Sequence, residues 1–276
     1  MIDLRTYGDV AKTLRFIETH LFSWDLIISK NEMEADVAII LGTGLDGIFD
    51  EVYKGLHWLH YNEIPFFPDA PEFQYGYMDF LEIKGKKVIV MFGRPHYYQG
   101  YSMEEITYPI RVLRGLGVKH LILTSSVGGV SLEVKKGDLM VVADHINFFS
   151  ENPFRGRSCG FDLGEVYSDR LRKLVTDAAL KNSIELKNGI LAYTSGPVFE
   201  TPAEAKMFQK LGIDAVGWSV VPEATMARFL GMEVLAISCV TDVNYPRAED
   251  RDKILETAEK SAEKLKILIE SIIESI

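Results

Sequence analysis

Residues 189–211, GILAYTSGPVFETPAEAKMFQKL, predict a strand that leads through a short loop into a helix. The apolar run Gly189–Thr194 has the length and composition of a buried strand. The helix is expected over Thr201–Leu211, since the threonine can cap it and Pro202 suits its first turn. Glu204 stands three residues after the threonine, where it completes a capping box. A strand followed by a capped helix is the building unit of a layered α/β fold.

The rest of the chain repeats this alternation. Further strands are expected at Val37–Leu41, Phe80–Ile83, Val88–Phe92, Leu121–Thr124, Leu139–Ala143 and Val234–Val240. Further helices are expected at Val10–Phe22, Ser102–Gly115, Ser168–Asn182, Pro222–Leu230 and Asp250–Ile276. Lys84-Gly85 predicts a tight turn between two strands. Because no repeat or linker interrupts the pattern, residues 1–276 are expected to form one α/β domain with a mixed, largely parallel twisted sheet flanked by helices.

Composition narrows the class of protein. The 276 residues are 47% hydrophobic and 25% charged, which is ordinary for a globular protein. The net charge of −10 disfavours nucleic acid as a partner, because phosphate contacts along a strand need a basic face. Cys159 and Cys239 form neither a disulfide framework nor a metal-binding spacing. No apolar run approaches the length of a membrane span, and the first residues lack a signal-peptide pattern. We therefore expect a cytoplasmic protein that binds neither nucleic acid nor membrane.

Glu200 lies between an aromatic ring and the start of a helix. The macrodipole at a helix N-terminus favours an ionised carboxylate, and Phe199 offers a flat apolar face beside it. A fixed carboxylate next to an aromatic ring suits a flat, polar heterocycle. The alternative is an ordinary helix cap with a solvent-exposed glutamate.

Two motifs that follow predicted strands have the residues of an anion site. Gly42-Thr43-Gly44 lets backbone amides approach an anion and adds the Thr43 hydroxyl. In GRPHYYQGY, residues 93–101, Arg94 offers a planar fork and a protonated His96 a second donor. Because Arg94 and His96 are two residues apart, their side chains point to the same side of an extended chain. Tyr98 adds a hydroxyl. The alternatives are a structural turn for the first motif and a surface loop for the second.

Three later motifs also follow strands. Ser125–Gly129 combines hydroxyls with glycine-exposed amides, and Ser219 precedes a helix N-terminus, where a hydroxyl is a good phosphate donor. Asp242 would add a second acidic group at the rim of a shared cleft. The structural alternatives are a tight turn, a helix N-cap and the start of a loop. Trp218 would cover an apolar substrate face or belong to the core.

In this order, the motifs resemble those of the trimeric purine nucleoside phosphorylases and their methylthioadenosine phosphorylase relatives. The resemblance runs from Val37 to the C-terminal helix. It rests most specifically on GRPHYYQGY, GPVFETPAEA and GWSVVPEATMAR, with GTGLD and TSSVGG in matching order. It implies an α/β homotrimer, a pentosyltransferase of purine salvage that reversibly cleaves purine nucleosides with phosphate. Phosphate would be a co-substrate, and neither a cofactor nor a metal ion is expected.

Matching each motif by position assigns roles to individual residues. Phosphate would be held by Thr43, Arg94, His96, the backbone at Ser126, and Ser219. The ribose would contact Tyr98 and Trp218. The base would lie against Phe199, Glu200, Val216 and Asp242, so that His96, Glu200 and Asp242 are the catalytic candidates. Phe161, in the loop NPFRGRSCGF, would be the aromatic residue lent to a neighbouring subunit's site.

The sequence departs from the family pattern at several of these places. Gln74, Gln99, Trp218 and Arg251 replace a histidine, an acidic residue, a methionine and a second histidine. Ser125–Gly129 replaces an Asn-Ala-Ala-Gly-Gly block.

The base-binding residues mix two patterns: Glu200 is the feature of enzymes that act on 6-oxopurines, whereas an aspartate at 242 is similar to the adenine-handling relatives. The base and the 5′ substituent therefore stay open. The alternatives are a methylthioadenosine or adenosine phosphorylase, a nucleosidase that uses water, and a non-catalytic nucleoside-binding protein.

Overall fold

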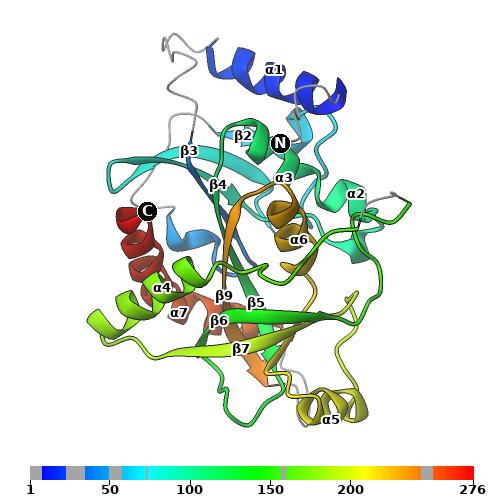
Figure 1. Ribbon diagram of the computed structural model, residues 1–276, viewed down its shortest axis with the longest axis vertical. Coiled ribbons are helices and arrows are strands. Elements are labelled where there is room, and N and C mark those ends of the chain that lie inside the picture. Colours follow the sequence, from blue (N-terminus) through cyan, green and yellow to red (C-terminus); the bar gives the residue numbers. More distant parts are fainter. Residues whose placement is uncertain (1–7, 23–34, 50–57, 73, 157–159, 244–250) are drawn as a thin grey trace.

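A computed structural model describes residues 8–22, 35–49, 58–72, 74–156, 160–243 and 251–276. A nine-stranded sheet runs through the molecule, and β1 (Val37–Leu41) lies inside it, hydrogen-bonded on both sides (Figure 1). Its five residues are all buried, because the strand is covered on both faces. Ala38 and Ile40 pack into one apolar cluster, while Val37, Ile39 and Leu41 pack into the other. A continuous apolar run is therefore what this position requires.

The sheet has the order β2-β3-β4-β1-β5-β8-β7-β6-β9, and β5 also pairs with β9. The other strands are β2 (Leu59–His60), β3 (Tyr77–Ile83), β4 (Lys86–Phe92), β5 (His120–Gly129), β6 (Leu139–Asn147), β7 (Leu186–Tyr193), β8 (Ala215–Gly217) and β9 (Glu233–Val243). Parallel pairs are β1–β4, β1–β5, β5–β9, β6–β7 and β7–β8; antiparallel pairs are β2–β3, β3–β4, β5–β8 and β6–β9. The predicted α/β class is confirmed, with a sheet more evenly mixed than expected.

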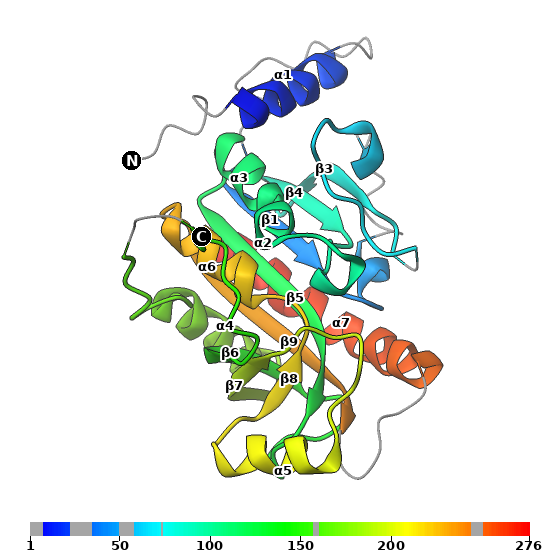
Figure 2. The same ribbon diagram turned by 90° about the vertical axis from the view of Figure 1, so that its right-hand side faces the viewer.

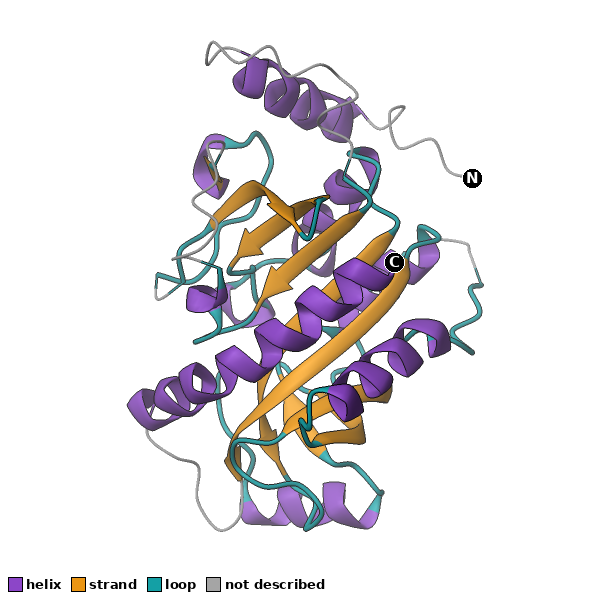
Figure 3. Ribbon diagram, turned by 90° about the vertical axis from the view of Figure 1, so that its left-hand side faces the viewer, coloured by secondary structure: helices purple, strands orange, loops and turns teal. Residues whose placement is uncertain are grey.

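Helices cover both faces of the sheet. α4 (Asp169–Lys181) and α7 (Arg251–Ser275) lie side by side across one face (Figure 3). The opposite face carries α2 (Met103–Ile106), α3 (Tyr108–Gly115) and α6 (Val221–Phe229), and α1 (Gly8–Phe22) packs on α3 at the top of the view in Figure 2. α5 (Pro202–Lys210) lies at the end of the sheet and buries Ala205 and Phe208 in a small cluster of its own. The helices of the two layers do not cover that end of the sheet, where the loops that leave the strands lie.

The strand predictions are confirmed in place but differ in extent. Lys84-Gly85 forms the turn between the antiparallel strands β3 and β4, as expected. β2 and β8, which are two and three residues long, were not predicted. Ser125–Gly129 and Thr241–Val243, predicted as loops, are strand instead, because β5 and β9 pair in parallel along their whole length. A register shift between Val127 and Gly128 marks the bulge in this pairing.

The capping boxes at Ser102 and Thr201 are confirmed, and Ser168 caps α4. The prediction of one helix over Ser102–Gly115 is wrong, because the chain breaks at Thr107 into α2 and α3. Pro109 lies in the first turn of α3, and it has no N–H to continue the hydrogen-bond ladder of α2.

No helix among the described residues is long and apolar enough to cross a bilayer. Cys159, Asn244 and the side chain of Arg251 lie outside the described residues.

Candidate active site

A cavity of about 290 Å³ lies beside the carboxyl ends of β1, β4, β5 and β9. Ligands bind at this edge of α/β sheets, because the loops that leave the strands converge there. The residues that line it include every predicted site residue except Phe161: Thr43, Arg94, His96, Tyr98, Ser126, Phe199, Glu200, Val216, Trp218, Ser219 and Asp242. The shared cleft expected from the sequence is present.

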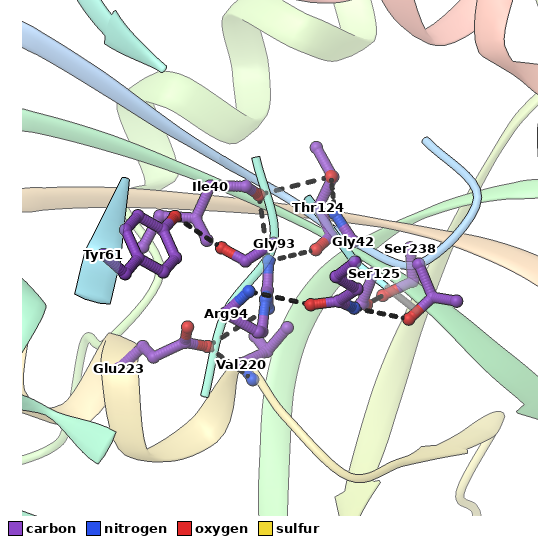
Figure 4. A network of polar contacts seen from close by, with 12 residues as sticks. Ile40, Gly42, Tyr61, Gly93, Arg94, Thr124, Ser125, Val220, Glu223 and Ser238 are labelled. Carbon is purple, nitrogen blue, oxygen red and sulfur yellow. Dashed lines mark hydrogen bonds and ion pairs between the residues drawn. The ribbon is translucent and has the colours of Figure 1, made fainter. Parts of the chain in front are cut away.

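Arg94 follows β4 and is almost completely buried, with 1% of its surface exposed. Its Nη2 donates to the carbonyl oxygens of Ile40 at 2.9 Å and Thr124 at 2.5 Å. Its Nη1 donates to a carboxylate oxygen of Glu223 at 3.1 Å (Figure 4). Nε is buried and has no acceptor among the described residues. Three of its five N–H groups make these bonds, so the guanidinium is held rigidly in the wall of the cavity with Nε–H among those left over.

His96 lies two residues further on, beside the guanidinium. Burial, and then the charge of Arg94, lower the pKa of the His96 imidazole to about 3. The lowered pKa favours a neutral imidazole, because a second cation next to Arg94 is disfavoured. The donor role of a protonated His96 stays a prediction. A neutral imidazole still offers one N–H, and the buried Nδ1 has no partner among the described residues.

Aromatic rings line one side of the cavity without a gap. The His96 imidazole stacks on Tyr98 with ring centroids 4.9 Å apart, and Tyr98 meets Trp218 edge-on at 6.0 Å. Phe199 continues the row 5.1 Å from Trp218. Gly196 is required beneath the indole, because a Cβ there would lie 2.7 Å from a Trp218 ring carbon. Of the two predicted positions of Trp218, the cavity wall and the core, the structure shows the cavity wall.

The glycine loop after β1 is joined to its neighbours by side chains. Thr43 Oγ1 accepts a hydrogen bond from Gln74 Nε2 at 2.7 Å, and Gln74 Oε1 accepts from the Arg94 backbone N–H at 2.8 Å. The Ser126 hydroxyl donates to the Thr43 carbonyl at 2.7 Å. Gly42 allows this approach, since a Cβ there would lie 2.6 Å from Ser125 Cα. Gln74 thus links two predicted anion donors, a position that the sequence marked only as a departure.

The predicted alternative for Ser219, a helix N-cap, is wrong. The N-cap of α6 is Val220, which has a positive φ of 74°, and the Ser219 carbonyl accepts from the Val221 N–H at 2.9 Å. Ser219 precedes the cap and lines the cavity. A helix N-terminus, with the hydroxyl in front of it, is therefore presented to the same space as Arg94.

Glu200 also lines the cavity, immediately before the α5 capping box. Its Oε1 accepts a hydrogen bond from the Thr194 hydroxyl at 3.2 Å. Burial raises the pKa of its carboxyl, opposed by hydrogen bonds from its own backbone N–H, from Thr194 and from the Trp218 indole. Phe199 beside it keeps 40% of its surface exposed. The partly buried carboxylate and half-exposed ring match the expected pair, and the predicted solvent-exposed cap residue is instead Glu204.

Asp242 lies on β9, opposite Gly128 in the β5–β9 pairing, and only 2% of its surface is exposed. Val216, on β8, pairs with the same glycine from the other side. Asp242 and Val216 thus flank the bulged end of β5, and both line the cavity.

Several cavity residues were predicted within motifs and not as individual site residues. Ser125, Val127, Gly128 and Thr241 lie on strands that were expected to end earlier, and Gly217 lies on a strand that was not expected. Ile254, on the first turn of α7, had no signal beyond the helical periodicity. Phe161 does not line this cavity; it packs on Phe154 and Phe229 of the same chain. Among the described residues, no cluster of three or more histidine, cysteine or acidic side chains could hold a metal ion.

Comparison with known proteins places this cleft in a family. Residues 36–274 match the family model of the phosphorylase superfamily. Purine nucleoside phosphorylase 1 of Geobacillus stearothermophilus is 40% identical over 234 residues, covering 81% of this chain and 85% of the relative. Purine nucleoside phosphorylase of Rattus norvegicus is 32% identical over 288 residues, covering 98% of this chain and 96% of the relative.

Solved structures agree with these matches over the full length. A Schistosoma purine nucleoside phosphorylase in complex with hypoxanthine superimposes with a TM-score of 0.87 at 31% identity, covering 100% of this chain and 99% of that one. The Schistosoma mansoni enzyme in complex with adenosine gives 0.85 at 30% identity, with the same coverage. The chain therefore belongs to the phosphorylase superfamily and, within it, to the purine nucleoside phosphorylases.

Proposed function

We propose that this cleft carries out the reversible phosphorolysis of purine nucleosides, giving the free base and a pentose 1-phosphate. The supporting observation is that one cavity is lined by two kinds of polar group. Arg94 and His96 line it, and Arg94 Nε and His96 Nδ1 are buried without a partner among the described residues. The carboxyl side chains of Glu200 and Asp242 line it as well. We place an anion against the first pair and a base that donates hydrogen bonds against the second, as the two ends of the site.

At the anionic end, Arg94, His96, Thr43 and Ser219 would hold phosphate together with the backbone at Ser126. Arg94 contributes its fixed charge, and the other groups contribute neutral donors. The N-terminus of α6 adds its dipole behind Ser219. This set argues against a nucleosidase, because water needs no cation and no row of donors.

The aromatic rings of Tyr98, Trp218 and Phe199 line the same cavity. Tyr98 and Trp218 would contact the ribose, and Phe199 and Val216 would contact the faces of the base. Glu200 would accept a hydrogen bond from N1–H of a 6-oxopurine. Asp242, when ionised, would accept from a 6-amino group; when protonated, it would donate to N7.

The reaction would begin with phosphate held below the anomeric carbon. A phosphate oxygen forms a bond to that carbon as the carbon–nitrogen bond breaks, and the electron pair of the broken bond goes to the purine. The pentose passes through an oxocarbenium-like state. Catalysis is then positioning plus stabilisation of the charge that grows on the base. Glu200 and Asp242 act at the leaving group, and Arg94 and His96 hold the nucleophile.

The preferred base is tested by an assay of inosine, guanosine, adenosine, xanthosine and methylthioadenosine, each with and without phosphate. We expect turnover that depends on phosphate and is abolished in Arg94→Ala. Turnover without phosphate would identify a nucleosidase. Binding without turnover would identify a nucleoside-binding protein, and a preference for methylthioadenosine the methylthioadenosine phosphorylase alternative.

Four further expectations accompany the proposed function. The chain would act as one domain over residues 1–276, in the cytoplasm, with phosphate as co-substrate and no resident cofactor. It would form a homotrimer, in which Phe161 approaches the cavity of a neighbouring subunit. Its position outside its own cavity, against Phe229 of α6, is compatible with that role. Sedimentation velocity of the purified protein tests the trimer.

A further inference from the structure

The chain makes an unusual turn before α6. Val220 has φ 74° and ψ −53°, and the carbonyl of Ser219 accepts from the N–H of Val221 at 2.9 Å. These angles and this bond describe a γ-turn of the rare type with a positive central φ. A β-branched residue is strained in this conformation, so the surrounding structure must hold it there. The turn is also what places Ser219 in the cavity.

Glu223 holds this turn from inside the protein. Its side chain is buried, and Oε2 accepts from the Val220 backbone N–H at 2.8 Å. The same oxygen accepts from Arg94 Nη1 at 3.1 Å (Figure 4). One atom therefore joins the strained turn to the guanidinium, although Arg94 and Glu223 are 129 residues apart in sequence.

The other two capping glutamates show that this arrangement exceeds what capping needs. Glu105 and Glu204 also accept from the backbone N–H of their N-cap residues, and both are exposed. Each reciprocates with a Ser or Thr hydroxyl at the cap. Val220 has no such hydroxyl, and Glu223 is buried at a desolvation cost that Arg94 offsets. The burial of Glu223 is explained by its bond to Arg94.

We propose that Glu223 is a positioning residue that fixes Arg94 and Ser219 relative to each other, so that they bind phosphate as one preorganised unit. The inference rests on the phosphate site of the proposed function. Glu223 itself does not line the cavity, so its effect on phosphate is exerted through its two partners. A carboxylate at this place also neutralises Arg94 in the absence of phosphate.

The test compares Glu223→Gln and Glu223→Ala with Met226→Ala. Met226 is buried on the same helix and contacts the apolar core, so its truncation destabilises α6 without touching Arg94. Calorimetric titration with inorganic phosphate gives the affinity, and steady-state kinetics gives separate KM values for phosphate and nucleoside.

We expect Glu223→Ala to raise the Kd and KM for phosphate at least ~10-fold, as for loss of a charge-assisted hydrogen bond. The KM for the nucleoside should change less than about threefold, which corresponds to less free energy than one neutral hydrogen bond contributes. Glu223→Gln keeps an acceptor oxygen and should lie between wild type and the alanine variant. Met226→Ala should lower the Tm and leave phosphate affinity unchanged.

Two results would overturn the inference. One is a phosphate Kd within twofold of wild type in Glu223→Ala while Arg94→Ala abolishes binding. The other is an equal rise of both KM values, as general loosening of α6 would give. If Arg94→Ala itself binds phosphate normally, the proposed phosphate site is wrong and the inference falls with it.

Discussion

The buried pair between Arg94 and Glu223 allows function and stability to be separated. The two side chains keep 1% and 4% of their surfaces exposed. Replacing Arg94 with Met leaves the Glu223 carboxylate buried without its cation, which costs about 3–5 kcal/mol in comparable pairs. The carbonyl of Thr124 also loses its donor, at about 1 kcal/mol. The free energy of unfolding should fall by roughly 4–6 kcal/mol, as the sum of these two costs.

Replacing both partners with Met should recover most of this loss. An apolar pair of similar volume removes the uncompensated charge, and such exchanges are often neutral or stabilising. The backbone N–H of Val220 and the carbonyl of Thr124 still lack their partners, at about 1 kcal/mol each, which leaves the double variant about 2 kcal/mol below wild type. Phosphate binding should be lost in both variants, because both lack the guanidinium.

Thermal unfolding at constant protein concentration measures the difference. At about 2–4 °C per kcal/mol, the single variant should melt roughly 8–24 °C below wild type, and the double variant no more than about 8 °C below. Glu223→Met alone completes the double-mutant cycle. A double variant that is no more stable than Arg94→Met would refute the reasoning, since it would show that the stray carboxylate is not what destabilises the single variant.

Three further perturbations test the site. Glu200→Ala should lower kcat/KM for any accepted 6-oxopurine nucleoside at least ~10²-fold, the loss expected for a charged hydrogen bond; a near-normal value would remove Glu200 from the site. Asp242→Asn should shift the ratio of kcat/KM values toward inosine and guanosine over adenosine, and an unchanged ratio would contradict a role at the base. His96 should make stability depend on pH: unfolded, it takes up a proton near pH 6.5, whereas folded it does so only near pH 3. Its contribution is therefore complete above pH 6.5 and is lost as the pH falls toward 3. The Tm of wild type should thus drop more between pH 7.5 and 5.5 than that of His96→Gln, and an equal drop in both would contradict this assignment.

The parts of the fold that local chemistry decides were predictable from the sequence. The buried run Val37–Leu41 specifies a central strand, and the capping boxes at Ser102 and Thr201 specify helix starts, because each signal lies within a few residues. β8 has no such signal. Its three residues are a strand only because β5 and β7 lie on either side of them. The extensions of β5 and β9 likewise depend on their mutual pairing.

The same division applies to the site. Arg94, His96 and Glu200 stand in motifs of conspicuous composition, so their place in the cleft was predictable. Glu223 was not, since an acidic residue in the first turn of a helix usually faces water. The available signal was its position in an otherwise apolar stretch, Val220-Val221-Pro222-Glu223-Ala224. The lowered pKa of His96 was not predictable, because its causes, burial and then the charge of Arg94, arise only in the folded chain.

The pairing of β5 with β9 also determines when the site can exist during folding. Ser125 and Ser238 share a hydrogen bond across this pairing although 113 residues separate them. Arg94 is bonded to Glu223, which lies 129 residues later in the sequence. Contacts of such long range form slowly, because the entropy of closing the loop is lost before the contact stabilises it. Phosphate capture would therefore report on completed folding, and a nascent chain that ends before α6 would hold Arg94 without the groups that fix it.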